Sequence, residues 1–486
     1  MFFLKKLFSI FDIKQLKNLL AMQFMVIFIA LFEVIGIASI APFMAVVATP
    51  ESINTNKYLR FIFDFFTCET SNEFLVILGG IVFGFILIGN VLNLGMRWFM
   101  IYSGYQIGRK LEVRLFKSYL SEDYFFHTQK NSSILTKNIV HEVVRLTHNI
   151  AVQLLTLNAR FFTILFIMIG LIVVNYKVTL VASILYGISY ILIYSVIRRK
   201  LTLNSKKASK YSGKKYQIIS EALGGIKELK LHGKEELYVN DYDGVSEKCV
   251  HVTTYNTIIV HISRSFLEIM SFGIIISAVV FLVKSGQKIT DFLPLLSLFA
   301  MAGLRLIPSL QQLFASITVI KANTYSLDLT FEDLKKSMQA ELTKEKEIKR
   351  APYPLVKSLK LSNVDYRYSG THQNVLNELN IEVNSNTSIG IVGPTGAGKS
   401  TLVDIILGLL KPTSGDLIID GNKISTKEQL KKWQASIGYV PQSIYLLDNT
   451  IAKNIAFTLE DESIDQVRLQ DAARLAQLEE FILSKP

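Results

Sequence analysis

Long apolar runs constrain this chain more than any other feature of its sequence. An apolar stretch of about 20 residues is long enough to cross the hydrocarbon core of a bilayer as a helix. All the runs are interpreted as helices, because a helix satisfies its own backbone polar groups in lipid. Six spans are expected, at residues 19–47, 74–100, 161–174 (the apolar centre of a longer span), 178–197, 258–283 and 292–319.

Basic residues near the ends of these spans indicate their orientation. Lys and Arg are concentrated before the first span, after the second and after the fourth, and are fewer in the other connections. Cytoplasmic loops carry an excess of Lys and Arg, so both termini are expected in the cytoplasm. The same loops account for the net charge of +12, which in a soluble protein would suggest nucleic acid as a partner. No nucleic acid is expected here.

Two short segments are expected at the membrane surface. Residues 1–16 combine apolar bulk with lysines that can reach lipid phosphates, as in an amphipathic surface helix. In the loop after the first span, Lys57, Arg60 and Asp64 share one helical face. The apolar positions around them include Tyr58, Phe61, Ile62 and Phe65. This loop helix is either embedded among the outer head groups, where it engages a lipid tail, or packed as a cap on the bundle.

The polar connections 101–150 and 199–255 contain no proline and have helical spacing. They are interpreted as extensions of the spanning helices beyond the bilayer, either as docking tips for a partner surface or as ordinary solvated hairpins. Gly224, Gly225 and Gly233 allow a turn at the tip of the second connection. Residues 17–325 thus form a membrane domain, 326–355 a charged linker, and 356–486 a further domain of short β-type runs and helices.

A phosphate-binding loop is the strongest motif of that further domain. Its residues match G-x-x-x-x-G-K-S/T: Gly393, Pro394, Thr395, Gly396, Ala397, Gly398, Lys399 and Ser400. The apolar run 388–392 before it is expected to be a buried strand, and a helix follows it up to about residue 410. Strand, loop and helix therefore occur in the order that phosphate binding requires.

The chemistry expected of this loop follows from its residue types. Glycines let backbone N–H groups approach the phosphates, and the helix N-terminus adds its positive dipole end. Lys399 is expected to reach the β- and γ-phosphates and the Ser400 hydroxyl to bind magnesium. Thr401, the next residue, is assigned to the same nucleotide site. The sequence thus predicts ATP and Mg²⁺ as cofactors.

With six spans and one such loop, the chain resembles a half-transporter of the ATP-binding cassette (ABC) exporter family. The resemblance implies a type IV exporter-like membrane domain fused to an α/β nucleotide-binding domain, a homodimer, and ATP hydrolysis that drives translocation. Within VDYRY at 364–368, Tyr368 matches the aromatic ring that stacks on adenine. Within IGYVPQ at 437–442, Gln442 matches the glutamine that senses magnesium and the attacking water. Lys399 and Gln442 are accordingly the implied catalytic residues.

The family resemblance stops at Pro486. The signature motif, the strand with the magnesium-binding Asp and catalytic Glu (Walker B), and the switch histidine do not appear in the sequence. The nucleotide-binding domain is therefore expected to be incomplete, in a parent longer by roughly a hundred residues. A chain that ended here would hold nucleotide weakly without hydrolysing it, and a non-hydrolysing membrane scaffold is the corresponding alternative.

Charged residues within the spans are candidates for contact with a transported molecule. Arg97, Arg264 and Arg305 would favour an anionic group if they face a shared cavity, and a guanidinium suits phosphate well. The alternative is that Arg97 extends to the interface and that Arg264 pairs with Glu268, four residues along one helix.

An embedded loop helix and a basic cavity suggest an amphiphile with a phosphate head. Within the ABC exporters the chain resembles the bacterial flippases for lipid-linked oligosaccharides of protein N-glycosylation. That resemblance implies a multi-pass protein of the bacterial inner membrane that moves a polyprenyl-pyrophosphate-linked oligosaccharide towards the periplasm. An exporter of lipid A or of drugs would share the cassette and is the alternative.

Overall fold

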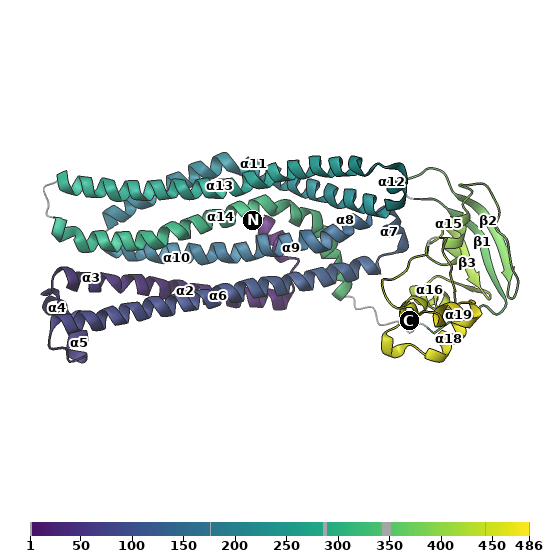
Figure 1. The fold of residues 1–486 in the computed structure, drawn as a ribbon, viewed down its shortest axis with the longest axis horizontal. Helices are drawn as coiled ribbons and strands as arrows, with labels where there is room; N and C mark the ends of the chain where they lie inside the picture. The colour runs from purple at the N-terminus through teal and green to yellow at the C-terminus, as the bar shows by residue number, and fades with distance from the viewer. Residues whose placement is uncertain are drawn as a thin grey trace. The chain divides into compact units, whose positions relative to one another are not determined.

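The structure, a computed structural model, describes residues 2–174, 176–284, 289–342, 351–368, 370–442 and 444–485 (Figure 1). The chain divides into two compact units, Met1–Glu345 and Lys346–Pro486. The first unit is helical and the second combines a small sheet with short helices. Each unit is described by itself below.

Long helices lying side by side build the first unit (Figure 1). They are α2 Ile13–Ala38, α3 Ile40–Ala48, α6 Ser71–Ser121, α10 Gln153–Val174, α11 Tyr176–Gly224, α13 Glu235–Lys284 and α14 Ile289–Leu342. Shorter elements join or cover them: α1 Phe2–Phe8, α4 Ser52–Thr55, α5 Lys57–Phe65, α7 Tyr124–Gln129, α8 Ser132–Lys137, α9 Val143–Leu146, α12 Ile226–His232 and the π-turns η1 Asn138–Glu142 and η2 Thr147–Val152.

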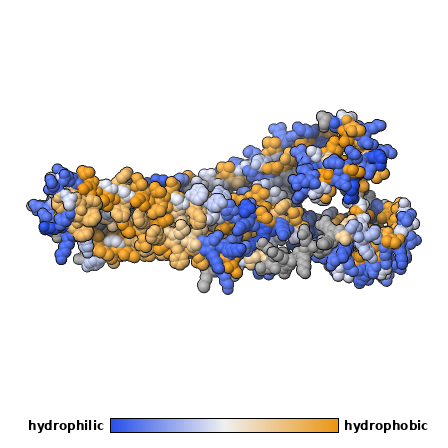
Figure 2. All heavy atoms as spheres, turned by 90° about the horizontal axis from the view of Figure 1, so that it is seen from below, coloured by the Kyte–Doolittle hydropathy of each residue, from blue (hydrophilic) through white to orange (hydrophobic). Residues whose placement is uncertain are grey.

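Four stretches of the described residues are long and apolar enough to cross a membrane. They are Ile13–Gly36, Ser71–Ser121, Ser132–Val174 and Ala302–Gln339. The expected fourth and fifth spans and the first part of the sixth contain side chains outside the described set. Figure 2 shows a broad hydrophobic surface over the helical unit, bounded by hydrophilic residues at one end. Val91, Leu94 and Trp98 are among the exposed large apolar side chains of α6.

The first expected span is two helices rather than one. Helix α2 ends at Ala38 and α3 begins at Ile40, with Ser39 between them. Pro42 explains the break, because it has no N–H to donate to the Ala38 carbonyl and its ring crowds that oxygen.

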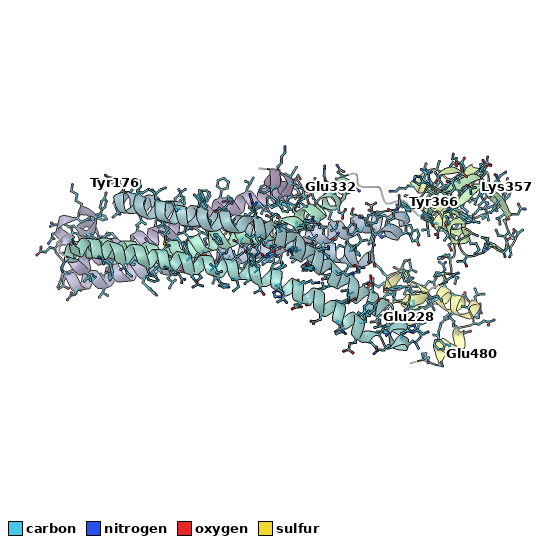
Figure 3. All side chains as sticks on the ribbon, turned by 90° about the horizontal axis from the view of Figure 1, so that it is seen from above. Tyr176, Glu228, Glu332, Lys357, Tyr366 and Glu480 are labelled. Carbon is cyan, nitrogen blue, oxygen red and sulfur yellow. The ribbon has the colours of Figure 1, made fainter. Side chains whose placement is uncertain are left out.

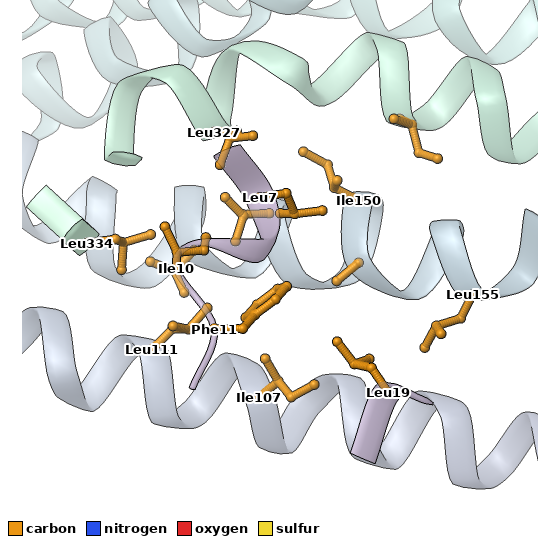
Figure 4. Close-up of a cluster of buried hydrophobic side chains, with 14 of the residues drawn as sticks. Leu7, Ile10, Phe11, Leu19, Ile107, Leu111, Ile150, Leu155, Leu327 and Leu334 are labelled. Carbon is orange, nitrogen blue, oxygen red and sulfur yellow. The ribbon is translucent and has the colours of Figure 1, made fainter. Parts of the chain in front are cut away.

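The N-terminal segment differs from the surface helix expected over residues 1–16. Helix α1 ends at Phe8, and the chain turns before α2 begins at Ile13. Leu7, Ile10 and Phe11 are buried in a core that α6, η2 and α14 complete (Figure 4). The Lys6 ammonium pairs with Asp328 at 2.6 Å. Helices of the same unit therefore bury apolar side chains that the sequence analysis expected to contact lipid.

Helix α5 packs one face on the bundle, as the cap interpretation expects, and leaves an apolar face exposed. Leu59 is buried, and Ile62 and Phe63 pack beside it against the ends of α3 and α6. Tyr58, Phe61 and Phe65 point away and are 82%, 71% and 71% exposed. Ile62 thus belongs to the packed cap, whereas the three aromatic rings form a free apolar face.

The two long polar connections are helical extensions of the preceding helices, as predicted. Helix α6 continues to Ser121 and α11 to Gly224, and α12 forms the tip of the second connection. Figure 3 places Tyr176 and Glu228 at opposite ends of the helical unit. Gly233 has a φ of 57°, the left-handed conformation in which glycine ends a helix without strain.

A buried ionic cluster is centred on Glu142, the last residue of η1. Glu142 is fully buried and pairs with Lys137 at 3.0 Å and with Arg145 at 3.5 Å. Its carboxylate also accepts a hydrogen bond from the Ser209 hydroxyl of α11 at 2.7 Å. Buried charges require such partners, so the cluster holds η1 against α11.

The second unit contains one antiparallel sheet with the order β2-β1-β3-β4. Its strands are β1 Ser358–Tyr366, β2 Leu376–Asn384, β3 Ser414–Ile419 and β4 Asn422–Lys423. The helices are α15 Lys399–Ile406, α16 Lys427–Gln434, α17 Ile451–Ile455, α18 Gln466–Leu475 and α19 Glu479–Leu483, with a 3₁₀ turn η3 Asp461–Ser463. Trp433 is buried, and its indole N–H donates to the Ile406 carbonyl at 2.8 Å, which joins α16 to α15.

The strand predicted at residues 388–392 is wrong, and the linker predicted from residue 326, expected to start as a helix, begins as part of a long helix of the first unit. Residues 388–392 form an extended exposed coil, with Val392 93% exposed, rather than a buried strand. Within the described residues no strand pairs with this run, and an unpaired strand has no ladder of hydrogen bonds to fix it. The segment 326–342, expected as the start of a linker, is the end of α14, where Leu327 and Leu334 are buried in the helical core.

Candidate functional site

The phosphate-loop motif folds as a tight loop that leads into α15. Gly396 and Gly398 both have a φ of 86°, which only glycine adopts readily. A Cβ at residue 398 would also lie 3.0 Å from Leu376 and 3.1 Å from Val375. Because backbone conformation and packing both exclude a side chain there, this glycine sets the direction in which α15 begins.

The Lys399 side chain lies across its own loop. Its ammonium donates hydrogen bonds to the carbonyl oxygens of Gly393 at 2.8 Å and Pro394 at 2.9 Å. The Ala397 N–H donates to the Pro394 carbonyl at 3.2 Å, which tightens the turn. A positive charge is thus held over a ring of exposed main-chain groups, an arrangement suited to an anion with several oxygens.

Tyr368, which the sequence assigns to base stacking, lies beside the first turn of α15. Its hydroxyl is 3.1 Å from the Thr401 hydroxyl in the first turn of α15. Its ring meets the Tyr366 ring edge-on, with centroids 5.0 Å apart. The structure therefore brings Tyr368 and Thr401 together, although 33 positions separate them in the chain.

The residues present fit a magnesium–nucleotide pair. The Ser400 side chain is exposed at the first turn of α15, beside the loop amides. No cluster of three or more His, Cys, Asp or Glu that could hold a metal occurs among the described residues. A magnesium ion held mainly by phosphate oxygens and water needs few protein ligands, so the Ser400 hydroxyl can be its only side-chain ligand here. Gln442 is exposed on the coil after α16, and in the described part of the chain it makes no hydrogen bond to Ser400 or Lys399.

A second polar site lies within the helical unit, where Glu33 of α2 is nearly buried. Its carboxylate accepts hydrogen bonds from the Asn93 amide at 2.6 Å and from the Thr163 hydroxyl at 3.2 Å. Arg160 of α10 and Arg305 of α14 approach it at 3.9 Å and 3.8 Å. Four helices thus contribute polar side chains to one point in an apolar bundle.

Two cavities meet at this glutamate. One, of about 230 Å³, is lined by Glu33, Asn93, Arg97, Arg160 and Thr163 together with apolar side chains of α2, α6 and α10. The other, of about 250 Å³, is lined by Glu33, Asn90 and Arg305. Arg160 also interacts electrostatically with both Arg97 and Arg305, so the three guanidinium groups form one basic cluster. This cluster is referred to below as the arginine cluster.

The structure separates the three arginines that the sequence placed in a shared cavity. Arg97 and Arg305 belong to the arginine cluster, but Arg264 lines neither cavity. Arg264 pairs with Glu268 at 2.9 Å one turn along α13, which is the alternative that the sequence left open.

Sequence reasoning missed Arg160, the third member of the cluster. Arg160 directly precedes residues 161–174, the apolar centre of the expected third span, and α10, which begins at Gln153, carries this arginine within the helix. A polar pattern was available as a signal, because Gln153, Thr156, Arg160 and Thr163 recur every three or four positions and line the same cavity.

Comparison with known proteins adds the following findings. The family description "ABC transporter transmembrane region" matches residues 38–303, and the description "ABC transporter" matches residues 376–485. Among solved structures, a bacterial Atm1-family ABC exporter with ATP bound superposes with a TM-score of 0.69 at 19% identity, over 98% of this chain and 79% of that one.

Curated relatives carry names of lipid and drug exporters. The "ATP-dependent lipid A-core flippase" of Cupriavidus pinatubonensis is 24% identical over 78% of this chain and 63% of its own length. That of Saccharophagus degradans is 25% identical over 80% of this chain and 64% of its own. A protein of Bacillus subtilis named for multidrug export is 23% identical over 77% and 64%. The chain thus spans a little under two thirds of the length of these relatives.

Proposed function

Because the chain belongs to the ABC transporter family and has the type IV exporter fold, we propose that it is one half of a homodimeric exporter that uses ATP to move an anionic amphiphile across a bacterial inner membrane. The apolar helices of the first unit support a multi-pass membrane protein. The proposal includes cytoplasmic termini, as the basic connections favour.

Each residue of the phosphate loop has a distinct role in this proposal. Main-chain amides of residues 393–400 and the Lys399 ammonium bind phosphate oxygens, with Lys399 exchanging its two carbonyl partners for phosphate. Ser400 binds the magnesium ion, which neutralises charge on the phosphates when bound. Tyr368 stacks on the base beside Thr401, and Gln442 orients the attacking water. A partner subunit is required, because in this family each nucleotide lies between two cassettes.

The main support for a cargo with an anionic head group is the arginine cluster. Placing charges inside a bilayer is costly, so they persist there mainly where they serve a pathway or a ligand. Three arginines against one glutamate leave an excess of positive charge beside two cavities. Guanidinium groups bind phosphate oxygens in pairs, which favours a phosphorylated amphiphile over a neutral one.

Two cargo classes fit such a site. A lipid A-type glycolipid is favoured by the names of the relatives in Cupriavidus and Saccharophagus. The second class is a polyprenyl-pyrophosphate-linked oligosaccharide, the cargo that the sequence resemblance to flippases of protein N-glycosylation implies. Such a cargo would place the protein in protein glycosylation, and helix α5 favours it. Its exposed rings Tyr58, Phe61 and Phe65 offer an apolar face for a long isoprenoid tail.

ATPase stimulation in liposomes tests the proposal and separates these classes. The full-length parent protein is purified and assayed with lipid A, with a polyprenyl-pyrophosphate glycolipid and with a neutral glycolipid. We expect stimulation by one of the first two and none by the third. Lys399→Ala should lower hydrolysis by about two orders of magnitude or more, since it removes charge stabilisation of the transferring phosphate. Unchanged hydrolysis in that variant, or equal stimulation by the neutral lipid, would contradict the proposal.

A further inference from the structure

A third cavity of the helical unit is much larger than the two that meet at Glu33. It is lined by residues of η1, α9, η2, α11, α13 and α14. Its volume is about 850 Å³, more than three times that of either of the other two. A space of this size lies in the range of sites for organic ligands rather than for a lone ion. It is called the polar cavity below.

Most residues of the polar cavity carry a hydrogen-bonding side chain. They include the amides of Asn149, Asn256 and Asn323 and the rings of Tyr216 and Tyr242. An acyl chain packed here would leave such groups without hydrogen-bond partners, which is costly. Amides and tyrosine rings instead suit a ligand that combines C–H faces with many hydroxyl groups. The wall of the cavity therefore favours the sugar part of an amphiphile over its tail.

The wall also carries positive charge. Arg145 and Lys215 line the polar cavity, and none of its described residues is Asp or Glu. The buried carboxylate of Glu142 is shared between Arg145 and Lys137, so it cannot neutralise both. In the described contacts Lys215 meets neutral groups alone, with its ammonium 4.8 Å from the centroid of the Tyr242 ring and 3.2 Å from a serine hydroxyl. Lys215 is thus available to an anionic group of a ligand.

One helical face leads from the arginine cluster to the polar cavity. Helices α9 and α10 and the turn η2 between them follow one another without a break (Figure 1). Polar side chains recur on this stretch every three or four positions, at Arg145, Asn149, Gln153, Thr156 and Arg160. The first two line the polar cavity, and the last three line a cavity beside Glu33. At about 1.5 Å per residue, Asn149 and Arg160 lie about 16 Å apart, which an extended head group of several sugars can span.

We propose that the polar cavity binds the sugar part of the transported amphiphile, and that this sugar part carries a carboxylate or phosphate of its own besides the phosphate held by the arginine cluster. This inference rests on the proposed function and narrows its cargo to glycolipids with an acidic sugar part. A polyprenyl-pyrophosphate cargo with neutral sugars would leave Lys215 without an anionic partner.

Binding of two matched lipids tests the inference. Native mass spectrometry of the detergent-solubilised full-length parent protein compares lipid A with lipid A extended by octulosonic sugars, each of which adds one carboxylate. Binding that survives in the Arg97→Gln/Arg160→Gln variant is subtracted as non-specific. We expect the extended lipid to bind about tenfold more tightly, because its carboxylates accept charge-assisted hydrogen bonds in the polar cavity. Equal binding of the two lipids would overturn the inference.

A pair of substitutions on α11 separates the polar cavity from the general surface charge. Lys215→Gln should remove most of the tenfold advantage and leave the binding of lipid A itself within about twofold of wild type. Lys214→Gln removes the neighbouring lysine, which is exposed and does not line the polar cavity, and should leave the advantage unchanged. The same loss in both variants would show that surface charge attracts the lipid, which overturns the inference.

Adding a negative charge gives a second, independent variant. Asn256→Asp places a carboxylate of nearly the same shape in the wall of the polar cavity, and should weaken binding of the extended lipid by about tenfold through repulsion. Thermal unfolding without lipid confirms that this variant and the lysine variants are folded. Unaltered binding in both Lys215→Gln and Asn256→Asp would contradict a role for the polar cavity.

The two cysteines of the chain report where the sugar part lies. Cys249 lines the polar cavity, whereas Cys68 lines none of the three cavities. Alkylation by N-ethylmaleimide is read at each cysteine by peptide mass spectrometry. The extended lipid should slow alkylation severalfold at Cys249 alone, and a polyprenyl-pyrophosphate glycolipid with neutral sugars should not. No protection of Cys249 by a tightly bound extended lipid, or equal protection by the neutral sugars, would overturn the inference.

Two further outcomes distinguish this failure from failure of the proposed function. If none of these lipids binds the wild-type protein above the Arg97→Gln/Arg160→Gln background, the anionic cargo itself is refuted. If the deacylated, water-soluble saccharide of the extended lipid binds as tightly as the lipid, the polar cavity takes a soluble anion and its role in cargo binding is overturned. Tight binding of the lipid beside weak binding of the saccharide supports a glycolipid.

Discussion

Gly104 of α6 is a single residue on which the packing of the helical unit depends. A Cβ there would lie 2.2 Å from Cγ2 of Val152, a buried and stiff side chain of η2. We expect Gly104→Ala to lower the free energy of unfolding by about 1–3 kcal/mol, because overpacking forces the two elements apart. Thermal unfolding of the purified protein measures the change.

The same helix provides a matched control for this substitution. Gly95 has no atom within 4 Å of its Cβ position. Gly95→Ala should therefore be neutral or stabilise by up to about 1 kcal/mol, since alanine favours a helix over glycine. Adding Val152→Ala to Gly104→Ala should recover stability by making room. If Gly104→Ala and Gly95→Ala have the same unfolding temperature, close packing against Val152 is not the reason that residue 104 must be glycine.

Within the second unit, Asp420 joins two elements that are far apart in the sequence. Its carboxylate, in the turn between β3 and β4, accepts hydrogen bonds from the backbone N–H groups of Val356, Lys357 and Ser358 at 2.9, 2.6 and 2.9 Å. These bonds, led by that from Val356, hold the pKa of Asp420 below its usual value. The turn thereby fixes the residues at which β1 begins.

This lowered pKa predicts a pH dependence of stability. A carboxyl whose pKa is lower in the folded state stabilises the fold above its unfolded pKa, near about 4, and loses that contribution as pH falls through the folded value. Asp420→Asn should therefore be less stable than wild type at pH 7, and the difference should shrink below about pH 4. Fluorescence of the buried Trp433 in a Trp98→Phe background reports unfolding of this unit.

Asp471→Asn is the control for that series, because this exposed carboxylate of the same unit pairs only with the neighbouring Arg474 in the described contacts. It should leave the pH profile unchanged. A constant difference between Asp420→Asn and wild type from pH 7 to about pH 3 would show that the carboxylate charge is not what holds the turn.

The elements also show what sequence alone could predict. The spans, the helical extensions and the phosphate loop follow from patterns within a few residues, and the break at Ser39 could have been read from Pro42. Burial of Leu7 and Phe11 depends on contacts with α6 and α14 far along the chain. The proximity of Glu33 to Arg160 and Arg305 likewise depends on how three separate helices pack together, which no local pattern predicts. Residues 388–392 have an apolar strand pattern, but a strand also needs a neighbour to pair with.

At the scale of the whole molecule, the proposed exporter must link a membrane cavity in one unit to nucleotide hydrolysis in the other. If the arginine cluster binds the head group, its loss should abolish stimulation by cargo while the phosphate loop still functions. We therefore expect Arg97→Gln/Arg160→Gln/Arg305→Gln to retain basal ATPase activity within about twofold and to lose most of the lipid-stimulated increment. The assay is ATP hydrolysis by the full-length parent protein in liposomes with and without the stimulating lipid.

Arg264→Gln is the decisive comparison for this prediction. It removes an intramembrane guanidinium of the same kind, but one that pairs with Glu268 and lines neither cavity. Stimulation should survive in this variant, because its arginine lies outside the arginine cluster. If Arg264→Gln abolishes stimulation as completely as the triple variant does, positive charge anywhere in the bundle is sufficient and the cluster is not the cargo site. If the triple variant also loses basal hydrolysis, its arginines support the fold that couples the two units and need not contact cargo.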